Sequence, residues 1–182
     1  AEITNLNITT GDAAGSLTFA SLAGVTALGT VTIDTDDTLT FTTGATTATT
    51  VGSITVTGKA SDVNLGTWMA DGNGASGTIG DITFKGSSST GTDLTIEGVL
   101  SVGAISTAAA TAGTYTIVLN NNTVIGTTMT GGAATTDIFT GTGGADVFHF
   151  GSTDQMVGNG GADSFTAAAA VTSATITGSA GA

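Results

Sequence analysis

Short runs in which apolar and polar residues alternate recur along residues 1–130. Most of them pair a β-branched or other apolar residue with Thr, Ser or Asn, and glycines or small polar clusters separate one run from the next. A period of two places the apolar side chains on one face of a strand. The pattern therefore predicts many short, half-buried β-strands and almost no helix. The clearest runs cover residues 3–8, 16–19, 31–33, 39–41, 54–56, 81–84, 94–96 and 115–119.

The apolar residues of these runs are mostly medium-sized, which indicates a thin core. An immunoglobulin-like β-sandwich usually has aromatic residues in a wide core and prolines in its loops, whereas this chain has one Trp, one Tyr, seven Phe and no Pro. A parallel β-solenoid tolerates such a composition. We expect residues 1–130 to form a strand-rich β-solenoid, with a β-sandwich as the alternative. The preferred fold is all-β, one continuous right-handed parallel solenoid with the C-terminal segment stacked on its end.

Composition and charge narrow the class of protein further. The 182 residues include 29 Gly, no Cys and 14 acidic side chains against two lysines, for a net charge of −12. Nucleic acid is an unsuitable partner, because the chain lacks the cationic side chains that neutralise phosphates. No run approaches the roughly 20 apolar residues of a membrane span. Without cysteine there are no disulfides, so rigidity has to come from another source, such as a metal ion.

Four aspartates near the C-terminal end recur at intervals of 9, 8 and 9 residues: Asp137, Asp146, Asp154 and Asp163. The sequences around the second and the fourth aspartate are nearly the same. Residues 141–148 are Gly-Thr-Gly-Gly-Ala-Asp-Val-Phe, and residues 158–165 are Gly-Asn-Gly-Gly-Ala-Asp-Ser-Phe. This is the Gly-Gly-x-Gly-x-Asp-x-U-x nonapeptide of parallel β-rolls, in which U is a large apolar residue. Each nonapeptide forms a turn and a short strand, and two of them complete one coil.

The residue types in this repeat favour calcium. Glycines let the turn adopt positive φ and let carbonyl groups approach an ion, and the aspartate adds a hard carboxylate oxygen, which Ca²⁺ prefers. The large apolar residue points inward from the strand and fills the core. The U residues are Phe139, Phe148, Met156 and Phe165.

Because two nonapeptides make one coil, every second aspartate lies on the same side of the roll. Asp146 and Asp163 therefore stack, and we expect the best calcium site between loops 141–146 and 158–163. Four glycines shape these two loops: Gly141, Gly143, Gly158 and Gly160.

The other side of the roll is less regular. The turn before Asp137 lacks a glycine, and the spacing of 8 before Asp154 implies a one-residue deletion. We expect a degraded second calcium site there. The alternative for each aspartate is an ordinary Gly-Asp turn. Two further features are ambiguous: the acidic segment 34–37 and the Asp-Gly-Asn-Gly segment 71–74 could bind calcium or be solvated turns. Beside the latter, Trp68 is interpreted as a plug at a coil corner.

Catalysis has little support in the sequence. The single histidine, His149, occupies the ninth, outward position of a nonapeptide. There is no cysteine nucleophile, no arginine to hold an anionic substrate, and no His/Cys cluster for zinc. We expect a structural protein and no enzyme.

The nonapeptides resemble the RTX repeats of proteins that bacteria export by type I secretion, a resemblance specific over residues 131–166. The Thr-, Gly- and Ala-rich sequence of residues 1–130 resembles the lattice-forming part of RTX-bearing surface-layer proteins of the Caulobacter type. The resemblance implies a calcium β-roll over residues 131–182. Residues 178–182 loosely match the start of a further nonapeptide, so we expect the roll to be truncated at its C-terminal end. It also implies folding driven by calcium outside the cell, self-association at the bacterial cell surface, and contact with a cell-surface polysaccharide. A calcium-stabilised module of a large RTX adhesin, binding sugars or surfaces, is the alternative.

Overall fold

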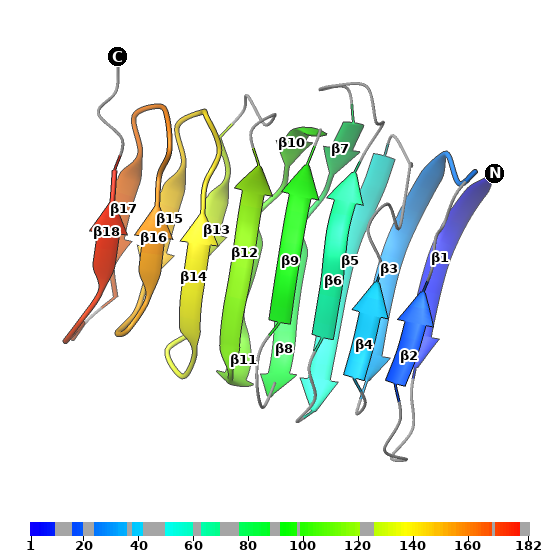
Figure 1. Cartoon of the computed structure of the whole chain (residues 1–182), viewed down its shortest axis with the longest axis horizontal. Coiled ribbons are helices and arrows are strands. Elements are labelled where there is room, and N and C mark those ends of the chain that lie inside the picture. The colour runs from blue at the N-terminus through cyan, green and yellow to red at the C-terminus, as the bar shows by residue number, and fades with distance from the viewer. Residues whose placement is uncertain are drawn as a thin grey trace.

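The computed structural model describes residues 1–9, 16–19, 24–35, 38–41, 50–59, 63–69, 77–87, 92–97, 99–120, 126–168 and 170–178. Within these ranges the chain is all β and forms two sheets. Apart from two short strands, successive strands alternate between the sheets, so the chain winds as a β-solenoid whose coils stack along the long axis (Figure 1). The predicted parallel β-solenoid is confirmed. Nowhere in the described ranges is there a helix that could cross a membrane.

Sheet A runs along the whole stack. Its main path contains, in spatial order, β1 (Glu2–Thr9), β3 (Ala27–Thr35), β5 (Thr50–Lys59), β8 (Ile82–Ser87), β11 (Ile105–Ala112), β13 (Thr128–Thr130), β15 (Val147–Phe150) and β17 (Ser164–Ala167). Beside this path lie β7 (Gly77–Ile79) and β10 (Val99–Val102), which pair with each other.

Sheet B lies opposite sheet A and also spans the stack. Its strands, in spatial order, are β2 (Ser16–Phe19), β4 (Thr38–Phe41), β6 (Val63–Met69), β9 (Thr92–Glu97), β12 (Thr114–Asn120), β14 (Thr136–Thr140), β16 (Gln155–Val157) and β18 (Thr175–Thr177).

All pairings between described strands are parallel. An immunoglobulin-like sandwich has antiparallel sheets, so the alternative for residues 1–130 is wrong. Both sheets also continue past residue 130. In sheet A, β13 pairs with β11 on one side and β15 on the other, and in sheet B, β12 pairs with β14. The boundary at residue 131 between the strand-rich region and the nonapeptide repeats therefore lies within one continuous stack of coils.

The core is a narrow layer of inward-facing side chains between the two sheets. Its N-terminal part is built from Val, Ile and Leu, such as Val31, Ile54 and Ile82, all fully buried. Its C-terminal part contains the U residues of the nonapeptides. Three of these are fully buried and Phe165 is partly buried, with the rings of Phe148 and Phe165 stacked 4.9 Å apart. The prediction that the U residues point inward is confirmed.

The coils shorten toward the C-terminal end. In sheet A, Ile54 pairs with Ile82 and Ile82 pairs with Ile105, so the first of these two coils is the longer one. The coil that brings Phe148 beside Phe165 is shorter than either. Two nonapeptides with a one-residue deletion give this coil length, as the spacing of the aspartates predicts. The longer coils keep the same core register in sheet A.

A column of glycines runs along one corner of the solenoid and was not recognised in the sequence. A Cβ at Gly52 would lie 2.6 Å from the carbonyl oxygen of Gly29, and a Cβ at Gly103 would lie 2.6 Å from the carbonyl carbon of Gly80. Real Cβ atoms do not approach backbone so closely, so only glycine allows the coils to stack at this corner. The members of the column are Gly29, Gly52, Gly80 and Gly103.

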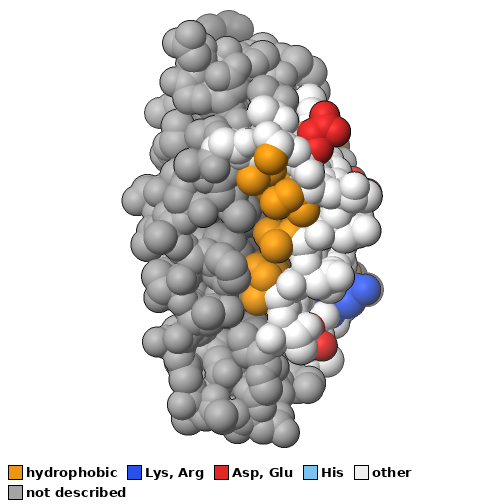
Figure 2. All heavy atoms as spheres, turned by 90° about the vertical axis from the view of Figure 1, so that its right-hand side faces the viewer, with side chains coloured by type: hydrophobic (Ala, Val, Ile, Leu, Met, Phe, Trp, Pro, Cys, Tyr) orange, Lys and Arg blue, Asp and Glu red, His pale blue; other side chains and the backbone are white. Residues whose placement is uncertain are grey.

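The two ends of the stack leave part of the core accessible. Figure 2 faces the β1 end and shows a strip of apolar side chains along it. On this strand Ile3 and Leu6 are only partly buried. On β18, at the other end, Ile176 is 47% exposed. Interior coils, which have a neighbour on each side, bury the corresponding positions.

Candidate metal centre

The structure brings the predicted aspartate pairs together on successive coils. Asp146 and Asp163 lie in one column, and the backbone N–H of Asp146 donates a 3.0 Å hydrogen bond to Oδ1 of Asp163. Asp137 and Asp154 lie in a second column, where the N–H of Asp137 donates a 2.9 Å hydrogen bond to Oδ1 of Asp154. In both pairs the partners are 17 residues apart. The role of these residues as metal ligands stays a prediction.

Three of the four carboxylates also close their own turns. Oδ2 of Asp146 accepts a 2.7 Å hydrogen bond from the N–H of Thr142, and Oδ2 of Asp154 accepts one of 2.7 Å from the N–H of Gly151. Oδ2 of Asp137 accepts hydrogen bonds from the N–H of Gly132 and the hydroxyl of Thr135. These three aspartates therefore help to fix the shape of their own turns.

Glycines allow the carboxylates to fold back over the turns. A Cβ at Gly141 would lie 2.5 Å from Oδ2 of Asp146, and a Cβ at Gly158 would overlap Oδ2 of Asp163. The second predicted glycine of each loop stacks on its counterpart, since a Cβ at Gly160 would lie 3.2 Å from the carbonyl oxygen of Gly143. All four predicted glycines thus lie in the two loops that flank the Asp146–Asp163 pair.

The turn before Asp154 shows how the chain accommodates the deletion. Thr153 adopts a positive φ of 71°, which is uncommon for a β-branched residue. Its hydroxyl lies 3.1 Å from that of Thr136 in the preceding coil. In the regular turn before Asp163, the residues with positive φ are Asn159 and Gly161. The shorter turn therefore keeps Asp154 in register with Asp137 through a strained backbone conformation.

The aspartate pairs lie in a protein environment that does not compensate their charge. Asp137, Asp146 and Asp154 are fully buried, and Asp163 is half-buried. Burial raises the pKa of Asp137 from 3.8 to about 6, and the charge of Asp154 adds to the effect, while the hydrogen bond from Thr135 and the nearby hydroxyl of Thr107 oppose it. Burial likewise raises the pKa of Asp146, with a smaller contribution from Asp163. Buried like charges of this kind require a proton or a cation.

The donor set fits a hard cation in part. Oδ1 of Asp137 is buried and has no hydrogen-bond partner among the described residues. Carboxylate oxygens next to glycine carbonyls are ligands that Ca²⁺ accepts. Among the described residues, however, no three His, Asp or Glu side chains come together. An ion would therefore be held by two carboxylates per site, with carbonyl oxygens and water completing its shell.

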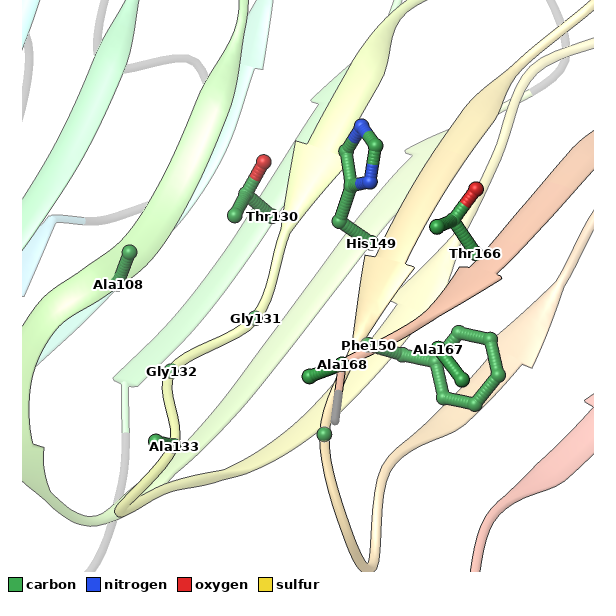
Figure 3. Close-up of a pocket in the computed structure, with 11 residues that line it drawn as sticks. Ala108, Thr130, Gly131, Gly132, Ala133, His149, Phe150, Thr166, Ala167 and Ala168 are labelled. Atoms are coloured by element: carbon green, nitrogen blue, oxygen red, sulfur yellow. The ribbon is translucent and has the colours of Figure 1, made fainter. Parts of the chain in front are cut away.

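His149 lies on the outer face of sheet A, where its carbonyl oxygen accepts a 2.8 Å hydrogen bond from the N–H of Gly131. Its side chain is exposed, as predicted, and lines a groove of about 300 Å³ together with Thr130 and Thr166 (Figure 3). The remaining lining is glycine, alanine and Phe150, and the groove wall contains no acidic side chain. In Figure 3 the three polar side chains stand in a row across neighbouring strands.

This row extends along sheet A. The register of the strands aligns one outward position of each coil, and all but one of the aligned residues from β3 to β17 carry a hydroxyl group: Thr32, Thr55, Thr83, Ser106, Thr130, His149 and Thr166. Because the coils differ in length, the row is not visible as a fixed period in the sequence. The position just after the inward-facing apolar residue of each sheet A strand would have revealed it.

Several predicted features fall outside the described residues. Asp36 and Asp37 of the acidic segment, the Asp-Gly-Asn-Gly segment 71–74, the side chain of Trp68 and residues 179–182 belong to this group.

No protein-family model matches the chain, and the comparisons with curated proteins and with solved structures also found no match. The interpretation of the aspartate columns therefore rests on their own geometry.

Proposed function

We propose that this chain is a calcium-stabilised β-solenoid that acts outside the cell as a structural subunit of a self-assembling surface layer. The observation that carries the proposal is the stacking of buried aspartates in two columns, with no cationic side chain beside them in the described part of the chain. Three of the four are fully buried, and the chain offers only two lysines against 14 acids. A divalent cation that accepts oxygen ligands would offset this charge.

Calcium would then couple folding to location. Where calcium is scarce, the paired carboxylates repel each other across successive coils and the short C-terminal coils are poorly stable. Where calcium is plentiful, the ion binds the folded form only, and its binding free energy adds to that of folding. The chain's own contribution is to hold the carboxylates in position through the turn hydrogen bonds from Thr142 and Gly151.

The assignment to a surface layer rests on resemblance. Residues 131–166 resemble RTX repeats, and the Thr-, Gly- and Ala-rich strands before them resemble the lattice-forming part of bacterial surface-layer proteins. A rigid solenoid with few lysines and no cysteine suits such a subunit. Localisation at the cell surface, self-association and contact with a cell-surface polysaccharide are parts of this proposal.

The test is size-resolved light scattering of the chain during a titration with Ca²⁺, with Mg²⁺ as the matched control. Large assemblies that form only with calcium and dissolve in EDTA are expected for a lattice subunit. Compaction without growth would support the second candidate below. No response to calcium would contradict the proposed role of the aspartates. The double variant Asp146→Asn/Asp163→Asn is expected to require more calcium for the same response.

The hydroxyl row on sheet A favours a second candidate, a binding module for an uncharged, hydroxyl-bearing surface such as a polysaccharide. Parallel strands are about 4.8 Å apart, so the row presents donors and acceptors at a regular spacing. Replacing Thr55 and Thr83 with valine should abolish retention on glycan resins without loss of stability. The matched control replaces Thr95 and Thr140, which face outward on sheet B. Equal retention of both variants would remove this candidate.

A further inference from the structure

The two aspartate pairs differ in how well the protein satisfies their oxygens, and the difference runs against the sequence motif. The consensus nonapeptides surround Asp146 and Asp163, whereas the turns of Asp137 and Asp154 are irregular. We infer that the first and tightest calcium ion binds between Asp137 and Asp154, above Gly131, and not between the two consensus repeats. This inference rests on the proposed calcium-binding function and specifies where binding begins.

The first argument is hydrogen bonding. Both oxygens of Asp146 already have donors, since Oδ1 accepts from the N–H of Thr127 and Oδ2 from that of Thr142. The hydroxyl of Thr142 reaches both oxygens at 3.1 Å. Oδ1 of Asp137, in contrast, is buried without a partner in the described structure. A buried, unpaired carboxylate oxygen carries a large desolvation penalty, which a bound cation would remove.

The second argument is space. A Cβ at Gly131 would lie 2.8 Å from Oδ2 of Asp154 and 2.9 Å from Oδ2 of Asp137. The absent side chain therefore marks a point between two carboxylates of successive coils. Calcium–oxygen distances are about 2.3–2.6 Å, so small shifts would bring both Oδ2 atoms to a shared ion. These two atoms accept hydrogen bonds in their own turns, and an ion at this point would satisfy the unpaired Oδ1 of Asp137 by binding that carboxylate through both of its oxygens.

The corresponding glycine of the consensus pair lacks this arrangement. A Cβ at Gly141 would meet one carboxylate, Oδ2 of Asp146 at 2.5 Å, and then the ring of Phe148 at 2.9 Å. A phenyl ring occupies the space in which the second carboxylate oxygen lies at Gly131. At Gly158, the glycine of the next turn, the three atoms nearest to a Cβ all belong to its own Asp163.

The third argument is burial. Asp137 and Asp154 are both fully buried, whereas Asp163 is half-buried. Repulsion between two carboxylates is stronger where water does not screen it. The gain from binding a cation is therefore larger at Asp137 and Asp154.

Tyr115 provides a spectroscopic probe for this site. It is the only tyrosine in the chain, it is buried, and it pairs in register with Asp137 on the neighbouring strand. A Tb³⁺ ion that replaces calcium near Asp137 should emit when Tyr115 is excited. In a Trp68→Phe background, the single tryptophan does not contribute to the signal.

The experiment follows tyrosine-sensitised Tb³⁺ emission and calorimetric Ca²⁺ binding in parallel, with circular dichroism to verify folding. Asp137→Asn should weaken the tightest binding step by more than about tenfold, while Asp163→Asn should leave it unchanged. Asp137→Asn removes an unpaired buried charge, so it is expected to fold without the ion. Gly131→Ala places a methyl group between the carboxylates and should also abolish the tight step.

The matched control is Gly151→Ala, whose Cβ would lie 3.6 Å from Oδ2 of Asp154 and 3.3 Å from the carbonyl oxygen of Gly132. It should retain the tight step and the emission. Loss of the tight step in Asp163→Asn with retention in Asp137→Asn would overturn the assignment and leave the proposed function standing. Absence of any Ca²⁺ or Tb³⁺ binding to the unmodified chain would overturn both.

Discussion

Oδ1 of Asp154 accepts a 2.9 Å hydrogen bond from the backbone N–H of Asp137, one coil earlier in the stack. The same carboxylate accepts a second hydrogen bond from Gly151 in its own turn. One side chain therefore fixes both the shape of a corner and the spacing to the next coil. The carboxylate is fully buried, and its two hydrogen bonds replace only part of the water that it loses on folding. Stability and charge are consequently coupled at this corner, and the coupling can be measured.

The pH dependence of stability should report this coupling. Because burial raises the pKa of Asp137 to about 6 from 3.8, the folded state binds this proton more tightly than the unfolded state. In EDTA, the contribution of Asp137 to stability should be most favourable below pH 3.8 and decrease as the pH rises to about 6. The difference amounts to about 3 kcal/mol. Urea unfolding at a series of pH values measures it.

Asp137→Asn is the control for this prediction. It should be more stable than the unmodified chain at pH 7 in EDTA and should lack that part of the pH dependence. If the two proteins show parallel curves between pH 4 and pH 7, another group is responsible. Asp146 has a raised pKa for the same reason, so some dependence of the same sign should remain.

Calcium should protect the C-terminal coils selectively. Hydrogen exchange in calcium, compared with EDTA, is expected to slow most for amides of β14 to β17, where the aspartates lie, and least for β1 to β5. Each coil of a solenoid contacts mainly its neighbours, so local binding has mainly local effects. Uniform protection along the whole chain would contradict the location of the ion sites in these coils.

The glycine column should be intolerant of any side chain. In Gly80→Ala the new Cβ would overlap the carbonyl group of Gly52, and we expect a loss of about 3 kcal/mol or more in the free energy of unfolding. Chemical denaturation measures the loss. Gly178→Ala is the control, because a Cβ there meets no atom within 4 Å, and its effect should remain within about 0.5 kcal/mol. Equal stability of the two variants would show that the coils are not in contact at this corner.

A buried hydroxyl links the glycine column to the aspartates. Thr127 is 5% exposed, and its hydroxyl donates one bifurcated hydrogen bond to the carbonyl oxygens of Gly103, at 2.6 Å, and Val102, at 3.1 Å. Thr127→Val keeps the shape and removes the donor, and should cost about 1–2 kcal/mol. Thr128→Val, on the outward-facing neighbour, should be close to neutral. A neutral Thr127→Val would mean that water replaces the lost donor.

The nonapeptide repeat was sufficient to predict the C-terminal coils from the sequence. Its fixed spacing places the U residues, such as Phe139 and Phe148, inside and stacks every second aspartate. In the N-terminal part, alternation predicted strands such as Ile54-Thr55-Val56, but not which strands pair. The coils there differ in length, as the pairs Ile54–Ile82 and Ile82–Ile105 show, so no constant period reveals the register.

The glycine column and the hydroxyl row were missed for that reason. Gly29, Gly52 and Gly80 each follow an apolar residue, but they become neighbours only once the coils are stacked. The difference between the two aspartate pairs was also inaccessible. It depends on the absence of a hydrogen-bond donor for Oδ1 of Asp137. The three-dimensional positions of Thr135 and Gly132 decide this, and the motif does not specify them.

The unequal coils divide the molecule by its tolerance to insertion. The coil from Ile54 to Ile82 is longer than the one from Ile82 to Ile105, and both keep the core in register. Corners of the N-terminal half can therefore accept grafted segments, and a designer could display peptides there. The short coil between Phe148 and Phe165 does not tolerate such changes in length, because a single insertion or deletion moves an aspartate out of its column. Insertions and deletions should therefore accumulate quickly at the corners of the N-terminal half and slowly at those of the short C-terminal coils.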